Sequence, residues 1–326
     1  MKHRHLPPDR LEMRIDVELI ADRLFADDEA RSRIVQDYGI GKTPGHGEHL
    51  TGMVIDSIAW PMRADPLAAA LDNGAVFRAA VWALGSNARP WGSFLAQEPA
   101  LAEALHGYDP LATHRAALGG KLGEAELRVL LPGQSSVADA RAVLRWARIL
   151  SEVPDYYAYL VEVAGVFQEM SRERFGRGLT GPELLLCVVG QIGGPPARWA
   201  GAARLSRRID PRHEKTPGMG YILASELLRN LGWDGFKPDR HVQRLIDLWW
   251  PGGAQQCLPE AGRLMELIGR NDAPLRTFLT YALAGMALAP EGVPLARVDH
   301  MVWMLGAYLE RRGRESGVRY VHNGRP

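Results

Sequence analysis

The sequence predicts an all-α protein, and three observations lead to this prediction. Apolar residues recur at helical spacing along most of the chain. Clusters of Gly and Pro interrupt this pattern repeatedly, as they do between helices. No stretch alternates apolar and polar residues for long enough to predict a sheet. We therefore expect a multi-helix protein built as two subdomains.

The helices are predicted from their apolar faces and their boundary residues. One is expected over 137–150 and the next over 157–167. The unbroken apolar run 184–189 would also suit a buried strand, but Pro182 just before it favours a helix start. The remaining helices are expected at 196–208, 220–231, 239–249, 258–269, 274–288 and 295–312. For the last of these, Asp299 is a candidate N-cap, and the Met- and Trp-containing run after it is expected to be core.

Two domains are expected from the length of 326 residues and from a joint at 131–134. Residues 1–131 form a helical region of unassigned role. Residues 132–326 form a helical domain with a helix-hairpin-helix motif at about 205–250 and a returning C-terminal helix.

Composition excludes several classes of protein. The net charge of +1 means that any nucleic-acid surface must be a local patch. Cys187 and Cys257 are the only cysteines, so a disulfide framework and a four-cysteine zinc or iron–sulfur site within one chain are excluded. We expect no metal and no cofactor. Long apolar runs and a secretory signal are both missing, which predicts a cytoplasmic protein without membrane association.

A glycine-rich turn, Pro217-Gly218-Met219-Gly220, is the most informative feature of the chain. Gly218 and Gly220 allow positive φ and close approach, so their backbone N–H groups could bind a phosphate. The residues that lead into the turn are rich in positive charge: Arg198, Arg204, Arg207, Arg208, Arg212 and Lys215. They suit contacts to a phosphate backbone, although a solvated helix face is the commoner role for such charges.

Asp239 begins the helix expected after the turn. Following Pro238, it is a natural N-cap, and most Asp residues in this setting do nothing else. Its carboxylate could also face a cleft and stabilise a cationic sugar while a glycosidic bond breaks. The two roles are compatible. His241 follows on the same helix, either as an ordinary helical residue or as a contact to DNA.

Together these features resemble the helix-hairpin-helix/Gly-Pro-Asp superfamily of DNA glycosylases, the endonuclease III-like enzymes. The hairpin matches at 217–220, the segment that carries the catalytic Asp matches at 238–242, and the resemblance covers about 185–250. It implies that Asp239 is catalytic and that double-stranded DNA is the partner, bound by a monomer during base excision repair. The implied DNA contacts are Gly218, Met219, Gly220, Arg212, Lys215 and His241.

The sequence departs from this superfamily at several positions. Thr216 replaces the usual apolar residue before the hairpin, and the usual iron–sulfur cysteines are missing. Bifunctional members carry a Lys at the position of Ile222, and an apolar side chain cannot form a Schiff base. The expected activity is therefore that of a monofunctional glycosylase, in which Asp239 assists attack by water.

A glycosylase needs a pocket for the base that leaves the helical stack. Asn87, Trp91 and Gln191 are candidate pocket or wedge residues, although a Trp in such a position is more often core. Two alternatives remain open. The chain could be a non-enzymatic helix-hairpin-helix DNA-binding protein in which Asp239 only caps, or an all-α interaction protein in which the hairpin is an ordinary turn.

Overall fold

The computed structural model describes residues 13–38, 65–87, 89–194, 199–206, 216–310 and 321–323. Nearly all the regular secondary structure of these residues is helical, so the predicted all-α class is confirmed. The exception is a short antiparallel ribbon, in which β1 (Met13–Ile15) pairs with β2 (Val321–Asn323). Three residues per strand are too few to leave an alternating pattern in the sequence, which explains why the ribbon was not predicted.

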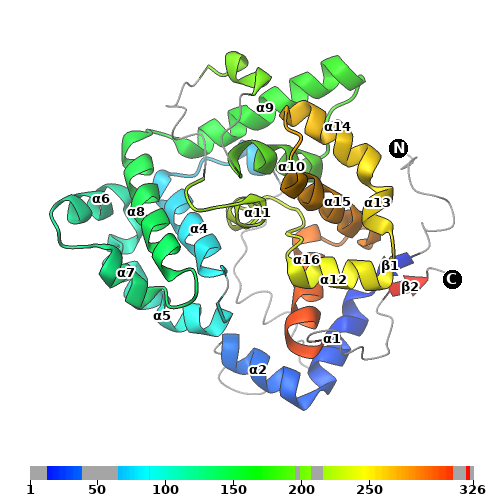
Figure 1. Ribbon diagram of the computed structural model, residues 1–326, viewed down its shortest axis with the longest axis horizontal. Coiled ribbons are helices and arrows are strands. Elements are labelled where there is room, and N and C mark those ends of the chain that lie inside the picture. The colour runs from blue at the N-terminus through cyan, green and yellow to red at the C-terminus, as the bar shows by residue number, and fades with distance from the viewer. Residues whose placement is uncertain are drawn as a thin grey trace.

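The helices form two groups, at the left and the right of Figure 1. The left group consists of α4 (Asn73–Gly85), α5 (Trp91–Ala104), α6 (Pro110–Leu118), α7 (Glu124–Leu130) and α8 (Ser136–Glu152). Two 3₁₀ turns accompany them, η1 (Pro66–Ala68) and η2 (His106–Tyr108). Because α6 and α7 both pack on α8, contacts cross the domain boundary expected after Leu131, and that boundary stays a prediction.

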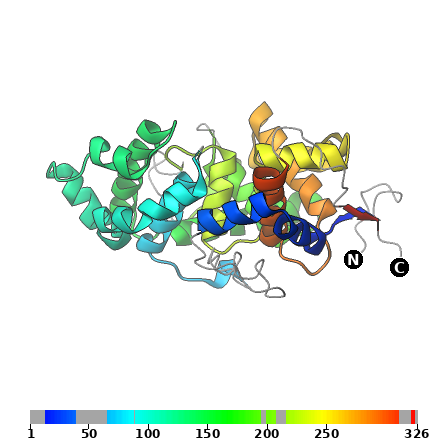
Figure 2. The same cartoon turned by 90° about the horizontal axis from the view of Figure 1, so that it is seen from below.

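The right group contains the second half of the chain and also its first helices. It consists of α12 (Arg240–Trp249), α13 (Gly253–Gln256), α14 (Leu258–Ile268), α15 (Ala273–Leu288) and α16 (Leu295–Met304). A π-helical turn, η4 (Leu305–Leu309), continues α16. Helix α1 (Val17–Ala26) packs on α16 and η4, and α2 (Asp28–Tyr38) packs on η4 and α5; Figure 2 shows both beside the last helix.

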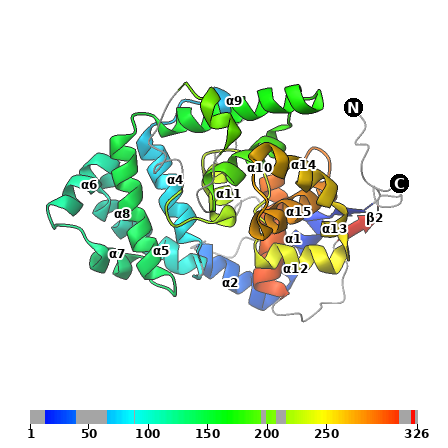
Figure 3. The same cartoon turned by 45° about the horizontal axis from the view of Figure 1, so that its top comes forward.

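Three helices connect the groups: α9 (Tyr156–Phe175), α10 (Gly181–Ile192) and α11 (Tyr221–Asn230). Helix α11 packs against α4, α10 and α15, and it lies between the two groups in Figure 3. The helix predicted from the run 184–189 is confirmed as α10. The α-helix predicted over 196–208 is wrong in its described part, because Ala200–Arg204 forms the 3₁₀ turn η3. The ring of Trp199 lies over Gly201 there and packs on Phe167, 4.6 Å between centroids.

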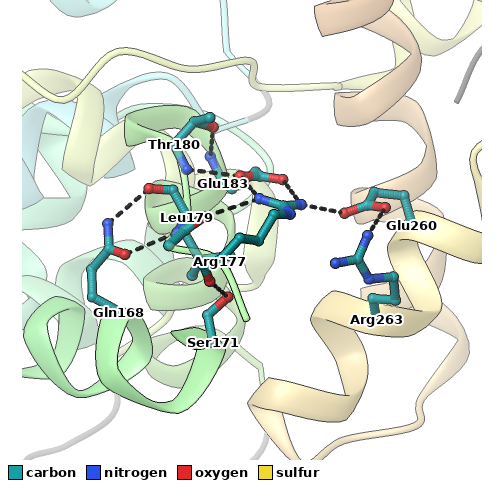
Figure 4. A network of polar contacts seen from close by, with 9 residues as sticks. Gln168, Ser171, Arg177, Leu179, Thr180, Glu183, Glu260 and Arg263 are labelled. Carbon is teal, nitrogen blue, oxygen red and sulfur yellow. Dashed lines mark hydrogen bonds and ion pairs between the residues drawn. The ribbon is translucent and has the colours of Figure 1, made fainter. Parts of the chain in front are cut away.

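The start of α10 is fixed by the polar network of Figure 4. Thr180 and Glu183 form a capping box, in which the Thr180 N–H donates to the Glu183 carboxylate at 2.7 Å. Arg177 binds Glu183 at 2.7 Å and reaches Glu260 of α14 at 3.1 Å. Gln168 of α9 pairs with both backbone groups of Leu179, at 2.7 and 2.8 Å. The network therefore ties α9, α10 and α14 together beneath α11.

The glycine-rich turn connects the end of α10 to the start of α11. The backbone N–H and the hydroxyl of Thr216 both donate to the carbonyl of Ile192 at 3.1 Å, which explains how a polar residue is buried there. Gly218 has φ +71°, and a Cβ on it would lie 2.5 Å from the Cβ of Ala142 in α8. Gly220 has φ −80° and opens α11 into free space. The expected positive φ is therefore confirmed for Gly218 and wrong for Gly220.

Serine substitutions at Gly218 and Gly220 should have different effects on stability, because the two positions differ in φ and in the space around them. Gly218→Ser is expected to lower the free energy of unfolding by more than about 1 kcal/mol, because it combines positive φ with a clash against α8. Gly220→Ser should be neutral or slightly stabilising, since the position is a helix N-cap with room for a side chain. Urea unfolding followed by far-UV circular dichroism measures both. Equal losses in the two variants would contradict this account of the turn.

Candidate functional site

A cavity of about 290 Å³ lies where α2, α4, α11, the start of α12 and α16 meet. Its wall is rich in aromatic rings: Tyr38, Trp82, Trp91, His300 and Trp303. It also carries polar and charged side chains: Arg78, Ser86, Arg89, Glu226, Arg229, Asn230, Lys237, Asp239 and Asp299. Flat apolar walls with a few convergent polar groups are typical of sites for planar organic ligands.

Asp239 lines this cavity and also caps α12. Its Oδ1 accepts hydrogen bonds from the backbone N–H groups of His241 at 2.8 Å and Val242 at 3.2 Å. Among the described residues, no group donates a hydrogen bond to its Oδ2. One carboxylate oxygen therefore holds the helix, and the other is available to an occupant of the cavity.

The loop 231–239 is anchored on both sides, which fixes the position of Asp239. Asp299, buried in α16, accepts the backbone N–H of Lys237 at 2.9 Å and forms an ion pair with Arg229 of α11 at 2.7 Å. Asp234 accepts the N–H groups of Leu295 at 3.1 Å and of Ala296 at 2.8 Å. The side chain that caps α16 is therefore Asp234. The N-cap role expected for Asp299 is wrong, because Asp299 lies inside the helix.

Burial and neighbouring positive charges have opposite effects on the pKa values of Asp299 and Glu226. Burial raises the pKa of Asp299 to about 7, although Arg229 and the Lys237 N–H both lower it. Burial would also raise the pKa of Glu226, but the nearby charges of Lys237 and Arg229 outweigh it and lower that pKa. Glu226 is therefore held as a carboxylate inside the protein.

His300 presents a neutral imidazole to the cavity. Burial first, and then the positive charges of Arg229 and Lys237, lower its pKa to about 3. Its ring stacks on Trp303 at 5.7 Å between centroids, and its Nε2 lies 3.4 Å from the hydroxyl oxygen of Tyr38. The Met- and Trp-containing run was expected to be core, which is confirmed for Met301 and Met304, while His300 and Trp303 also line the cavity.

Trp91, a predicted pocket residue, does line the cavity. It packs against Trp82 and Phe94, with centroids 5.9 and 5.1 Å away. The loop that leads to it is held by Asp139 of α8, which pairs with the fully buried Arg89. Asp139 also accepts the side-chain N–H of Asn87 at 3.0 Å. Asn87 therefore supports the loop and is not part of the cavity lining.

The other predicted site residues that the structure describes do not line the cavity. Gln191 is 1 % exposed inside α10, and Met219 is 5 % exposed in the turn. His241 lies on α12 with its Cβ against Gly306, and burial lowers its pKa. Arg212 and Lys215 lie outside the described residues. Arg204, the one member of the basic set that is described, pairs with Glu173 of α9 at 2.8 Å.

Sequence reasoning missed most of the cavity. Lys237 stood next to the predicted Pro238-Asp239 pair, and its proximity to a candidate catalytic residue was the one available signal. Glu226 and Arg229 were hidden on a helix that was predicted from its apolar face alone. Tyr38 comes from a segment to which no role was assigned.

Metal, disulfide and membrane features complete the description. In the described ranges, no group of three His, Cys, Asp or Glu side chains could hold a metal ion. Cys187 and Cys257 are buried and free. No helix among those described is long and apolar enough to cross a membrane.

The low pKa of His300 predicts that the stability of the fold depends on pH. His300 titrates near 6.5 in the unfolded chain but near 3 in the fold, so below pH 6.5 the unfolded state binds the additional proton. The contribution of a neutral His300 to stability is therefore present above pH 6.5 and lost as the pH falls toward 3. Relative to the wild type, His300→Gln should gain stability steadily across this window. A stability difference that does not change with pH in urea unfolding would contradict the neutral imidazole.

No protein-family model, no curated protein and no solved structure gives a match to this chain. What the protein does must therefore be argued from the cavity and the residues that line it.

Proposed function

We propose that this protein is a monofunctional DNA glycosylase, which hydrolyses the N-glycosidic bond of a damaged or modified base. One observation carries the proposal. Asp239, expected as the catalytic residue, and Trp91, one of three candidate pocket or wedge residues, line the same aromatic cavity although they are far apart in sequence. The resemblance around 217–242 supplies the chemistry that such a pair would perform.

In the proposed reaction the target nucleotide leaves the duplex and its base enters the cavity between the aromatic rings. As the bond from C1′ to the base nitrogen breaks, the base departs with the bonding electrons and the sugar becomes cationic. The free Oδ2 of Asp239 stabilises that cation and orients a water molecule. The water oxygen bonds to C1′, its proton passes to the carboxylate and then to solvent, and the departed base takes up a proton from solvent. The products are the free base and an intact abasic site.

The proposed enzyme releases the base without cleaving the DNA strand. Ile222 occupies the position of the lyase lysine and is a partly buried apolar residue of α11. Lys237 lines the cavity, but its ammonium is engaged with the Glu226 carboxylate at 3.4 Å and with the Ser86 hydroxyl at 3.2 Å. The hairpin would bind the DNA backbone, with Gly220 opening the N-terminus of α11 toward free space.

A second candidate is a non-enzymatic DNA-binding protein in which Asp239 only caps α12. The two hydrogen bonds to Oδ1 favour it, because they are sufficient to explain an Asp at this position.

As a glycosylase the protein would act in base excision repair as a monomer on double-stranded DNA in the cytoplasm. The second candidate would share the DNA partner but lack base release.

Asp239→Asn is the decisive substitution, because an amide caps a helix about as well as a carboxylate. We expect it to lower base release by at least about a hundredfold while DNA binding is retained or tightened, since it removes the negative charge near the cationic sugar. The assay follows abasic sites formed in duplex oligonucleotides that carry different lesions.

Asp109→Asn is the matched control. Asp109 caps α6 through one oxygen with the same geometry, accepting from Leu111 at 2.9 Å and Ala112 at 3.0 Å, and it does not line the cavity. It should leave base release unchanged. Full activity in a folded Asp239→Asn protein would remove Asp239 from the mechanism. A borohydride-trapped adduct with the wild type would show that a lysine acts as the nucleophile.

DNA binding should weaken as salt rises. The basic residues before the hairpin would displace counterions from phosphates, and each lost phosphate contact lowers the log–log salt slope by about 0.9. Fluorescence anisotropy with a labelled duplex at increasing salt measures this slope for the wild type and for Arg212→Gln. Binding that is absent at low salt, or insensitive to salt, would contradict both the enzymatic and the non-enzymatic DNA-binding proposals.

A further inference from the structure

The polar wall of the cavity contains a hydrogen-bond donor that is not fully used. The ammonium of Lys237 has three N–H groups. One points to Glu226 Oε2 at 3.4 Å and another to the Ser86 hydroxyl at 3.2 Å. The side chain is only 13 % exposed and lines the cavity. In the described part of the chain, the third N–H has no acceptor, so an occupant of the cavity can supply one.

A buried acceptor lies directly beside this donor. Glu226 Oε2 accepts both Lys237 and Arg229, the latter at 3.3 Å. Within the described residues, Oε1 of the same carboxylate accepts no hydrogen bond, although the side chain is only 8 % exposed and lines the cavity. Because Glu226 lines the cavity, a donor from a ligand can bind this oxygen.

The geometry points to recognition of a lactam edge: we propose that the cavity selects a nucleobase whose ring N–H donates to Glu226 Oε1 and whose adjacent carbonyl oxygen accepts from Lys237. This inference rests on the proposed function and narrows its substrate class. Uracil, hypoxanthine and oxidised guanine carry such an edge, and so do guanine and thymine. Adenine and cytosine present a ring nitrogen beside an exocyclic amino group instead.

Charge favours the lactam over the amino-substituted ring. A ring N–H next to a carbonyl is more acidic than an exocyclic amino group, so it forms the stronger hydrogen bond to a carboxylate. The carbonyl oxygen carries more negative charge than a ring nitrogen and is the better acceptor for an ammonium. Arg229 binds both Glu226 and Asp299, and it thereby fixes the orientation of the Glu226 carboxylate. The aromatic walls would hold the plane of the base in line with this pair.

Two measurements on the full-length protein test the inference, one of which needs no catalysis. The first titrates free hypoxanthine, adenine, uracil and cytosine, and follows quenching of the cavity tryptophans, Trp82, Trp91 and Trp303. The second compares excision from duplexes that differ only at the target base: hypoxanthine against adenine, uracil against cytosine, and 8-oxoguanine against O⁶-methylguanine, which lacks the ring N–H. We expect each lactam to be preferred by at least about tenfold, the factor of one charge-assisted hydrogen bond.

Two substitutions test whether Lys237 and Glu226 cause the preference for lactam bases. Lys237→Met should reduce it at least about tenfold. Glu226→Gln should also reduce it, because an amide can turn to offer either a donor or an acceptor. The matched control is Lys121→Met, which makes the same change at an exposed lysine outside the cavity and should leave the preference intact. Far-UV circular dichroism identifies variants that fold, and Lys237→Arg, which keeps a donor, should retain part of the preference.

The outcomes separate this inference from the proposed function. Excision without any preference for lactams, or with the preference unchanged in both variants, would overturn the inference while the glycosylase activity stands. Selective binding of free lactams without excision of any base would uphold the recognition and overturn the glycosylase. If no base is bound and none is excised, both are wrong.

Discussion

The buried ion pair between Arg229 and Asp299 is the interaction on which the site depends. It joins α11, the central helix, to α16, and the same Asp299 carboxylate also holds the backbone N–H of Lys237. The loop that ends in Asp239 is therefore positioned by a nearly buried ion pair at the cavity wall. Breaking such a pair from one side costs about 3–5 kcal/mol, because the remaining charge stays buried. The cavity and its fold are thus stabilised by the same groups.

Helices could be predicted from the sequence because their signals are local. The run 184–189 was ambiguous, and Pro182 decided it correctly as a helix. What failed depended on distant contacts. The 3₁₀ turn near Trp199 follows from its packing on Phe167 in another helix, and the β1–β2 ribbon joins segments from opposite ends of the described chain. Neither contact leaves a periodic pattern in the sequence.

For the site, the sequence predicted the residues that a motif or a local rule identifies. Asp239 was predicted as a cap and lies on the cavity wall, and Trp91 was predicted from its polar and aromatic setting. Glu226 could not be predicted, because a carboxylate on an apolar helix reads as a solvated residue until tertiary structure buries it. Gln191 shows the opposite error, since a polar residue at a helix end is here enclosed by the core.

Helices α1 and α2, from the start of the chain, pack against helical segments formed at its end, and this arrangement affects how the protein folds. Tyr38, at the end of α2, contributes to the same cavity as His300, with which it is in contact. During synthesis α2 can pack on α1 and α5 at once, whereas its contact with η4 and the contacts of α1 with α16 and η4 must wait for the end of the chain. Contacts of such long sequence separation slow folding. A chain stalled before α16 would carry Asp239 but lack His300 and Trp303 of the cavity wall.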